Sequence, residues 1–366
     1  MGFSLGIVGL PNVGKSTLFN AISRACAEVS NYPFCTKSKN LGVVPVPDDR
    51  LKKVQAFMKS AKAIPTAVEF VDIAGLVKNA HKGEGLGNQF LSYVREVDAI
   101  AHVVRCFPDP NIVHVEGSVD PARDIETINI ELILADMNTT EKRWQTLKST
   151  VKSGKKEILK ELEAVEKIKK HLEEGKPLRL LALSDDEKHE IRDLHLLTIK
   201  PVIYIANVDE KQLSGLNSDA AVRAVYEAAR KETADVIPIC AKLEMDIEGL
   251  SEEEGKEYEK DLGITEPGLD KVIKGGYKLL DLITFFTAND KECRAWTVKR
   301  DAKTPEAAGK IHTDMQRGFI SAEIIHYSDL INSESHAKAR EKGLIHLEGR
   351  DYVIADGDLV YIRFNV

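Results

Sequence analysis

The sequence predicts an α/β fold whose core is a mostly parallel sheet with helices on both faces. Three observations lead to this prediction. The apolar run 3–8 ends in a glycine loop and is followed by a helical pattern at 15–24. Apolar, β-rich runs bounded by loops recur at 68–71, 99–104, 201–206 and 236–240. Helical stretches separate these runs, an alternation typical of buried parallel strands, which bind ligands at their carboxyl ends.

An inserted helical domain is predicted at 128–199, where the strand signal fades. Apolar residues recur there at three- and four-residue spacings with Lys and Glu between them, as in an amphipathic helix. They are Leu147, Val151, Ile158, Leu162, Val165 and Leu172. Ser153-Gly154 predicts a break between two antiparallel helices. The segment 141–176 holds eleven Lys or Arg against seven Glu, so it is either a solvated face or a surface for RNA or another acidic partner.

A C-terminal domain is predicted at 281–366, after a first domain at 1–280 that contains the insert. The runs 283–287 and 294–298 predict a hairpin, and 305–315 predicts a helix. Closing strands are expected at 352–354 and 359–364, around the turn Asp356-Gly357-Asp358. This order of elements suggests a small α+β module of β-grasp type, without a catalytic constellation.

The composition excludes several classes of protein. A net charge of −7 and a pI of about 5.9 argue against a general nucleic-acid binder. No apolar run approaches the ~20 residues of a membrane helix, and residues 1–6 do not resemble a signal peptide. Five scattered cysteines without C-x-x-C spacing argue against disulfides or a zinc site and favour a reducing, cytoplasmic location.

The strongest functional signal is the P-loop pattern Gly9-x-x-x-x-Gly14-Lys15-Ser16. Its glycines let backbone N–H groups surround phosphates, and the helix that follows directs its positive end at the same anion. We expect Lys15 to reach the β- and γ-phosphates and the Ser16 hydroxyl to bind Mg²⁺. Because the pattern follows a predicted strand and opens a predicted helix, the first domain is predicted to be a P-loop nucleotide triphosphatase.

Two further positions are expected near the metal and the γ-phosphate. Asp72, in Asp72-Ile73-Ala74-Gly75, directly follows the strand 68–71, where a carboxylate typically holds Mg²⁺. Gly75 can offer its backbone N–H to the γ-phosphate. Thr36 lies in the loop after the P-loop helix, and its hydroxyl can add a Mg²⁺ ligand that orders this loop in the triphosphate state.

The base-binding loop is predicted at Asn207-Val208-Asp209-Glu210. Guanine-specific enzymes carry Asn-Lys-x-Asp here, and their Asp accepts two hydrogen bonds from guanine. This chain has Val208 in place of the Lys and Glu210 in place of the Asp, so guanine selectivity should be weak and ATP becomes plausible. A GTPase with relaxed base recognition is the alternative. Cys240-Ala241-Lys242 resembles the Ser-Ala-Lys loop that also contacts the base.

The residue that orients the attacking water is not the one found in Ras-like enzymes. Ras-like enzymes place a Gln after Asp-x-x-Gly, but this chain has Leu76. Hydrolysis therefore needs another group, for which His81 and His114 are candidates, or help from a partner or a monovalent cation. Asn12 occupies the P-loop position where some related enzymes use an Asn to help hold K⁺.

Together these motifs resemble the YchF-type, Obg-like ATPases over essentially the whole chain. The resemblance rests on residues 9–16, 31–36, 71–76, 82–87 and 207–210, and on the C-terminal stretch from Ala295-Trp296-Thr297 to Val366. It implies an OBG-type domain, an inserted helical hairpin and a C-terminal TGS domain, together with a preference for ATP and ribosome binding.

Several site residues follow from the resemblance. It implies that Asn12, Val13, Gly14, Lys15, Ser16 and Thr17 line the phosphates, and that Ser16 and Thr36 ligate Mg²⁺. It also implies that Asn207 and Val208 contact the base, with Phe107 nearby, and that His114 matches the catalytic histidine of the family. One departure is Lys37-Ser38-Lys39-Asn40, where the family usually has Ile-Glu-Pro-Asn. Two lysines there can alter how the loop closes on the γ-phosphate or meets RNA.

Three functional hypotheses remain open. The first is a monomeric, ribosome-associated ATPase that acts as a conformational switch in translation or stress response. The second is the GTPase with relaxed base recognition. The third is an RNA or ribosome adaptor whose hydrolysis is incidental.

Overall fold

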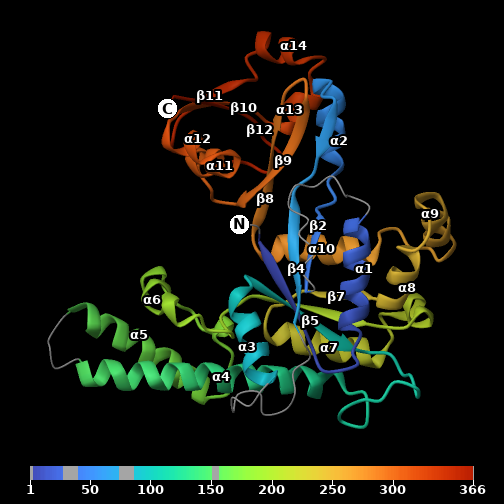
Figure 1. The fold of residues 1–366 in the computed structure, drawn as a ribbon, viewed down its shortest axis with the longest axis vertical. Coiled ribbons are helices and arrows are strands. Elements are labelled where there is room, and N and C mark those ends of the chain that lie inside the picture. The colour runs from blue at the N-terminus through green and yellow to red at the C-terminus, as the bar shows by residue number, and fades with distance from the viewer. Residues whose placement is uncertain (1–2, 28–39, 74–85, 151–155, 366) are drawn as a thin grey trace. The chain divides into compact units, whose positions relative to one another are not determined.

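A computed structural model describes residues 3–27, 40–73, 86–150 and 156–365. These residues form two compact units (Figure 1). The first unit comprises Phe3–Gly42 and Glu69–Gly276, and the second comprises Val43–Val68 and Tyr277–Val366. Within the described ranges, no helix is both long enough and apolar enough to span a membrane.

The first unit is built on a six-stranded sheet in the order β2-β4-β1-β5-β6-β7. Its strands are β2 Leu41–Pro45, β4 Ala67–Asp72, β1 Ser4–Val8, β5 Ala99–Arg105, β6 Val202–Asn207 and β7 Val236–Ile239. β1 pairs in parallel with β4 and β5, β5 with β6, and β6 with β7. The predicted strands and the α/β class are therefore confirmed, and every residue of β5 and β6 is buried.

Several helices lie between these strands in the chain or follow the last of them. They are α1 Lys15–Ala27, α3 Leu86–Glu96, α7 Ala220–Lys231, α8 Ala241–Ile247, α9 Glu252–Asp261 and α10 Gly268–Leu279. α10 approaches the strands closely through two glycines. A Cβ on Gly275 would lie 2.6 Å from Ile237, and one on Gly276 would lie 2.6 Å from Leu5.

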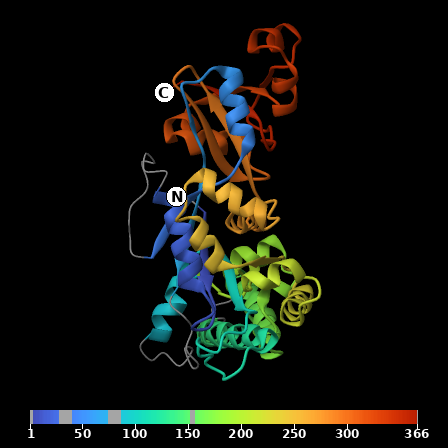
Figure 2. The same ribbon diagram turned by 90° about the vertical axis from the view of Figure 1, so that its right-hand side faces the viewer.

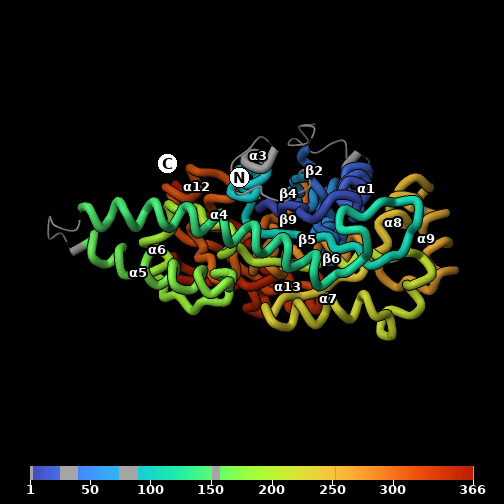
Figure 3. The backbone as a smooth tube through the Cα atoms, turned by 90° about the horizontal axis from the view of Figure 1, so that it is seen from below, coloured from blue at the N-terminus to red at the C-terminus, as the bar shows by residue number. Residues whose placement is uncertain are grey.

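The helical content predicted for 128–199 is observed as two long helices, α4 Pro121–Thr150 and α5 Lys156–Glu173, although α4 begins before the predicted start of the insert. Figure 3 shows the two helices side by side. The segment continues through η3 Leu178–Leu180, α6 Asp185–Ile191 and η4 Arg192–Leu194. Its own core includes Leu147, Val165 and Leu172, three residues of the predicted apolar seam. The predicted break at Ser153-Gly154 lies outside the described residues.

The second unit is also built on a six-stranded sheet, in the order β11-β10-β12-β8-β9-β3. Its strands are β11 His346–Glu348, β10 Phe319–Ile325, β12 Leu359–Phe364, β8 Leu282–Ala288, β9 Glu292–Lys299 and β3 Lys62–Ile64. The predicted hairpin is confirmed as the antiparallel pair β8–β9.

Two predictions for this unit are wrong. Residues 352–354 do not form a strand, because Val353 makes only an isolated bridge to Lys303. The helix predicted at 305–315 is divided into α11 Thr304–Ile311 and α12 Thr313–Arg317, because His312 adopts an extended conformation between them. Two short helices, α13 Tyr327–Asn332 and α14 His336–Glu341, complete the unit.

Residues 49–64 pack with the C-terminal sheet, a grouping that the linear division at 280/281 does not contain. β3 pairs in parallel with β9, and α2 Asp49–Met58 buries Leu51 and Val54 in the same core as Phe286. Figure 2 shows α2 in blue alongside the orange strands of this unit. Arg50 donates hydrogen bonds to both carboxylate oxygens of Asp356 at 2.9 and 3.1 Å.

Candidate nucleotide-binding site

The P-loop connects β1 to α1, as the sequence predicts. Gly9 and Gly14 are both required there, because neighbouring atoms lie so close to the loop backbone that a side chain has no room. A Cβ on Gly9 would lie 2.5 Å from the carbonyl oxygen of Val103, and one on Gly14 would lie 2.1 Å from Nδ2 of Asn207. Gly14 also has a φ of +99°, and Asn12 has a φ of 62°. The loop is thus fixed in a conformation that any side chain at Gly14 would disrupt.

Lys15 is buried at the first position of α1, where its ammonium donates a hydrogen bond of 2.7 Å to the carbonyl oxygen of Leu10. Burial lowers the pKa of Lys15 to about 8, and the charge of Asp72 acts in the opposite direction. Burial likewise raises the pKa of Asp72, while Lys15 lowers it. A buried ammonium at a helix N-terminus is therefore matched to an anionic ligand.

The predicted Mg²⁺ ligands lie partly within the described residues. Ser16 is exposed in the first turn of α1, and Asp72 is at the end of β4, next to β1 in the sheet. A hydroxyl and a carboxylate are hard oxygen donors, which suit Mg²⁺. Thr36, Gly75, Leu76, His81 and the lysines 37 and 39 lie outside the described residues.

Asn207 connects the predicted base loop to the P-loop. Its side-chain nitrogen Nδ2 donates to the carbonyl oxygen of Val13 at 2.8 Å, and its Oδ1 accepts from the backbone N–H of Ala241 at 3.1 Å. One amide thus connects the end of β6, the P-loop and the Cys240-Ala241-Lys242 loop.

The neighbouring residues of the base loop have different environments. Val208 is buried, and its backbone N–H donates to the carbonyl oxygen of Ile239. The Asp209 carboxylate caps the short helix η5 Glu210–Gly215 by accepting from the backbone N–H of Gln212. Glu210, at the position of the guanine-reading Asp, is exposed. The cap therefore engages Asp209, and Glu210 is the exposed carboxylate of this loop.

The segment that follows β5 carries Phe107 and His114, and the buried Arg105 organises it. The Arg105 guanidinium donates to the carbonyl oxygens of Phe107, Asp109 and Ile112 at 3.0–3.1 Å. It also lies over the Phe107 ring, 4.6 Å from the ring centre. Cys106 N–H donates to the carbonyl oxygen of Asn207 at 2.8 Å, which holds the start of this segment beside the base loop.

His114 is connected to the P-loop through its neighbour. The side-chain nitrogen of Asn12 donates to the carbonyl oxygen of Val113 at 3.1 Å. His114 itself is buried, with Nε2 2.9 Å from Oδ2 of Asp124 and Nδ1 3.1 Å from the backbone nitrogen of Glu116. The structure thus brings the His114 segment to the P-loop, with both ring nitrogens engaged by protein groups.

Comparison with known proteins relates these features to one group. The chain is 52% identical over 366 residues to the "Ribosome-binding ATPase YchF" of Bacillus subtilis (strain 168), and 52% identical to the protein of the same name from Escherichia coli O157:H7. Each alignment covers 100% of both chains. The chain belongs to the YchF family.

Further matches agree with membership of the YchF family. A family model described as "50S ribosome-binding GTPase" matches residues 4–159. The C-terminal YchF model, described as "Protein of unknown function (DUF933)", matches residues 282–365. The solved structure of the Schizosaccharomyces pombe YchF GTPase is similar with a TM-score of 0.89 and 37% identity, covering 99% of this chain and 98% of that chain.

Two residues of this YchF site were missed by the sequence analysis. Arg105 ends a strand that is otherwise apolar except for His102, and a charged residue there is itself a signal, because a buried charge needs partners. Asp124 lies in the first turn of α4, where an acidic residue is usually read as favourable to the helix dipole. Its contact with His114 depends on how the intervening loop folds, so the sequence carries no comparable signal.

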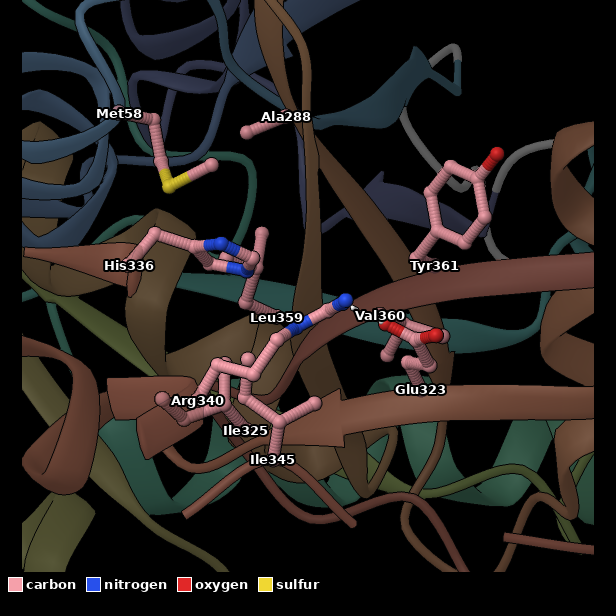
Figure 4. A pocket seen from close by; sticks show the side chains of 10 residues that line it. All are labelled: Met58, Ala288, Glu323, Ile325, His336, Arg340, Ile345, Leu359, Val360 and Tyr361. Atoms are coloured by element: carbon pink, nitrogen blue, oxygen red, sulfur yellow. Dashed lines mark hydrogen bonds and ion pairs between the residues drawn. The ribbon is translucent and has the colours of Figure 1, made fainter. Parts of the chain in front are cut away.

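A separate pocket of about 270 Å³ lies in the C-terminal unit. Figure 4 shows Arg340 directed at Glu323 beside the apolar side chains of Ile325 and Leu359. Arg340 donates to Glu323 at 2.7 Å, and Arg363 pairs with the same carboxylate. Two guanidinium groups thus share one carboxylate beside this pocket.

Proposed function

We propose that this YchF-family chain is a Mg²⁺-dependent ATPase that hydrolyses ATP to ADP and phosphate and acts in the cytoplasm as a nucleotide-dependent switch on the ribosome. The bridge from Asn207 to the P-loop carries this proposal, because it joins a base loop of unusual composition to the phosphate-binding loop. The curated relatives carry the name of ribosome-binding ATPase, which supports the same conclusion.

The phosphate chemistry is assigned to the P-loop. Backbone N–H groups of residues 12–17 surround the phosphates, and the Lys15 ammonium stabilises charge that develops as water attacks the γ-phosphate. Ser16 and Asp72, with Thr36 by family resemblance, would hold Mg²⁺, which supplies electrostatic stabilisation of the phosphate oxygens. Lys15→Ala is expected to abolish nucleotide binding, and retained affinity would remove the assignment.

ATP selectivity is assigned to the base loop. Val208 is buried and uncharged, and Asp209 is occupied as a helix cap, so neither reproduces the Lys and Asp of a guanine site. Glu210 is one methylene longer than that Asp. Asn207, Val208 and Phe107 are therefore proposed to contact adenine. The matching 50S ribosome-binding GTPase model and the similar Schizosaccharomyces pombe YchF GTPase keep relaxed base recognition as the second candidate.

Calorimetric titration with ATP and with GTP, both with Mg²⁺, tests the base assignment. We expect ATP to bind at least tenfold tighter, a difference of about 1.4 kcal/mol. The double variant Val208→Lys/Glu210→Asp should gain affinity for GTP, and Lys211→Ala is a matched surface control. Equal or tighter binding of GTP by the unmodified chain would overturn the assignment.

Ribosome contact is assigned to the basic α4–α5 hairpin, with the C-terminal TGS domain as a second RNA contact. Several basic residues of the hairpin are paired with acids, including Arg143 with Glu161 and Lys169 with Glu141, yet the segment keeps an excess of positive charge. Lys142, Lys160 and Lys170 are exposed, and so suit contact with phosphates.

Co-sedimentation with ribosomes, with and without nucleotide, tests this contact. Exchange of Lys142, Lys160 and Lys170 for Glu should weaken binding. The same exchange of Arg223, Arg230 and Lys231 on α7 is the matched control. Nucleotide-gated binding supports a switch, whereas binding that ignores nucleotide would favour an adaptor with incidental hydrolysis.

We propose that Asn12 helps to hold K⁺, so that the ATPase rate depends on the monovalent cation. Its Nδ2 is engaged by Val113, so the amide oxygen is the group that can face a cation. Equal ATPase rates in Na⁺ and K⁺ buffers would remove this role.

We further propose that the chain acts as a monomer, which sedimentation analysis tests.

A further inference from the structure

His114, in the segment before α4, and Asp124, in the first turn of α4, form a buried pair of side chains. His114 Nε2 and Asp124 Oδ2 are 2.9 Å apart, and both side chains are at most 4% exposed. The pair lies one residue from Val113, whose carbonyl oxygen binds the P-loop side chain of Asn12. A buried carboxylate and an imidazole are thus held at hydrogen-bond distance beside the phosphate-binding loop.

The hydrogen bonds define the tautomer of His114. Asp124 can only accept, so Nε2 carries the hydrogen and donates it to Oδ2. Nδ1 then holds the lone pair, and it accepts from the backbone N–H of Glu116 at 3.1 Å. The Asp124 bond is fully buried, whereas the bond from Glu116 is partly buried, so the second is the easier one to exchange.

Asp124 is itself fixed. Its other oxygen, Oδ1, accepts from Nε and Nη2 of Arg123 at 3.2 and 3.0 Å. The Arg123 guanidinium also donates to the carbonyl oxygen of Ser118 at 2.6 Å. With one oxygen committed to a guanidinium, the carboxylate presents Oδ2 to the imidazole in a single orientation.

We propose that Asp124 is a positioning residue for His114, which sets the imidazole with its lone pair on Nδ1 so that it can orient the attacking water. This proposal rests on the proposed ATPase function. In the hydrolytic state, an O–H of the water replaces the Glu116 N–H as the donor to Nδ1, while Nε2–H stays on Asp124. The role is one of orientation, so no bond is made or broken at the imidazole.

Asp124→Asn tests the tautomer directly. Arg123 requires an acceptor and so takes the amide oxygen, which turns the amide NH₂ towards Nε2 of His114. The ring must then carry its hydrogen on Nδ1, where it can no longer accept from water. We expect kcat for ATP to fall about tenfold or more, in line with the loss of an orienting group, while the Kd for ATP changes less than twofold.

Asp120→Asn is the matched control. Asp120 is an exposed carboxylate before the same helix, and it accepts from the backbone N–H of Arg123 without touching His114. Its kcat should stay within twofold of the unmodified chain. Nitrogen NMR shifts of the His114 ring should report hydrogen on Nε2 in the unmodified chain and on Nδ1 in Asp124→Asn. An unchanged tautomer would overturn the proposal even if the rate fell.

A double-variant cycle separates this proposal from the proposed function. His114→Ala should slow hydrolysis, and adding Asp124→Asn to it should slow hydrolysis no further. If His114→Ala is slow and the double variant is slower by a further tenfold, the positioning role of Asp124 is overturned, while the role of His114 stands. An unchanged rate in His114→Ala would remove His114 from catalysis and the positioning role with it, while Mg²⁺-dependent ATP turnover would still support the ATPase.

Discussion

The side-chain nitrogen of Asn207 lies 2.8 Å from the carbonyl oxygen of Val13, so the end of β6 is hydrogen-bonded directly to the P-loop. The same amide accepts from Ala241 at 3.1 Å. All three residues are buried. A hydrogen bond in such a position is costly to leave unmade, because the orphaned group has no access to water. The base loop and the phosphate loop are therefore energetically coupled through one side chain.

Asn207→Ala should lower both stability and nucleotide affinity. It leaves the carbonyl of Val13 and the N–H of Ala241 buried without this partner, which should cost about 2 kcal/mol or more of the free energy of unfolding. ATP affinity should fall about tenfold or more, equivalent to ~1.4 kcal/mol. Urea unfolding and calorimetry measure the two effects. Asn217→Ala, at an exposed position, is the control; equal behaviour of the two variants would contradict the coupling.

Gly14→Ala should disrupt the same junction from the other side. The new Cβ would lie 2.1 Å from Nδ2 of Asn207, in a backbone conformation with φ +99°. Gly263 offers a matched comparison, because its φ is +69° but nothing lies within 4 Å of an added Cβ. Gly263→Ala should therefore cost about 1 kcal/mol of stability through backbone strain alone, with ATP affinity unchanged. Gly14→Ala should lose at least tenfold in ATP affinity as well, and retained affinity would contradict the close contact.

The sequence predicts best the elements whose pattern is local. The run 99–104 is apolar except for His102 because both faces of β5 are covered, and its prediction as a strand is confirmed. β3 was missed because its partner β9 lies about 230 residues away in the sequence, so three half-exposed residues carry no signal of pairing. Residues 352–354 have the composition of a strand, but they form an extended segment with a single bridge, from Val353 to Lys303. The composition does not distinguish such a segment from a paired strand.

The candidate site shows the same limit. The P-loop motif specifies its strand–loop–helix context, because glycines, lysine and serine act through backbone geometry within eight residues. The environment of His114 depends instead on the path of residues 106–120. Arg105 fixes this path by binding three carbonyls, and spacing alone does not reveal such a network. The roles of Lys15, Ser16, Asp72, Thr36, Asn207, Val208 and His114 stay predictions.

Asp136→Ala should destabilise the helical insert. This carboxylate is fully buried on α4 and accepts three hydrogen bonds of 2.7–2.8 Å, from the backbone of Leu197 and from the backbone and hydroxyl of Thr198. Removing it leaves these donors unpaired, at a cost of about 2–4 kcal/mol. Hydrogen exchange of residues 133–198 should accelerate. Asp193→Ala, with a side chain 90% exposed in the same insert, should change the exchange rates little; similar exchange in both variants would contradict the anchoring role.

Nucleotide binding should take up a proton near pH 8. Burial lowers the pKa of Lys15 to about 8, so about half of the free protein has a neutral lysine at that pH. A triphosphate stabilises the ammonium and raises this pKa, so binding draws in about half a proton at pH 8 and much less at pH 6.5. ATP affinity should accordingly decline as the pH rises through 8. A terminal phosphate ionises near pH 6, so its own titration does not interfere at pH 8.

The uptake is measured as the slope of the calorimetric enthalpy against the ionisation enthalpy of the buffer. Lys15→Arg is the control, because a guanidinium stays charged throughout this range; if it binds ATP, its slope at pH 8 should vanish. A zero slope in the unmodified chain would show that Lys15 is already fully charged before the nucleotide arrives.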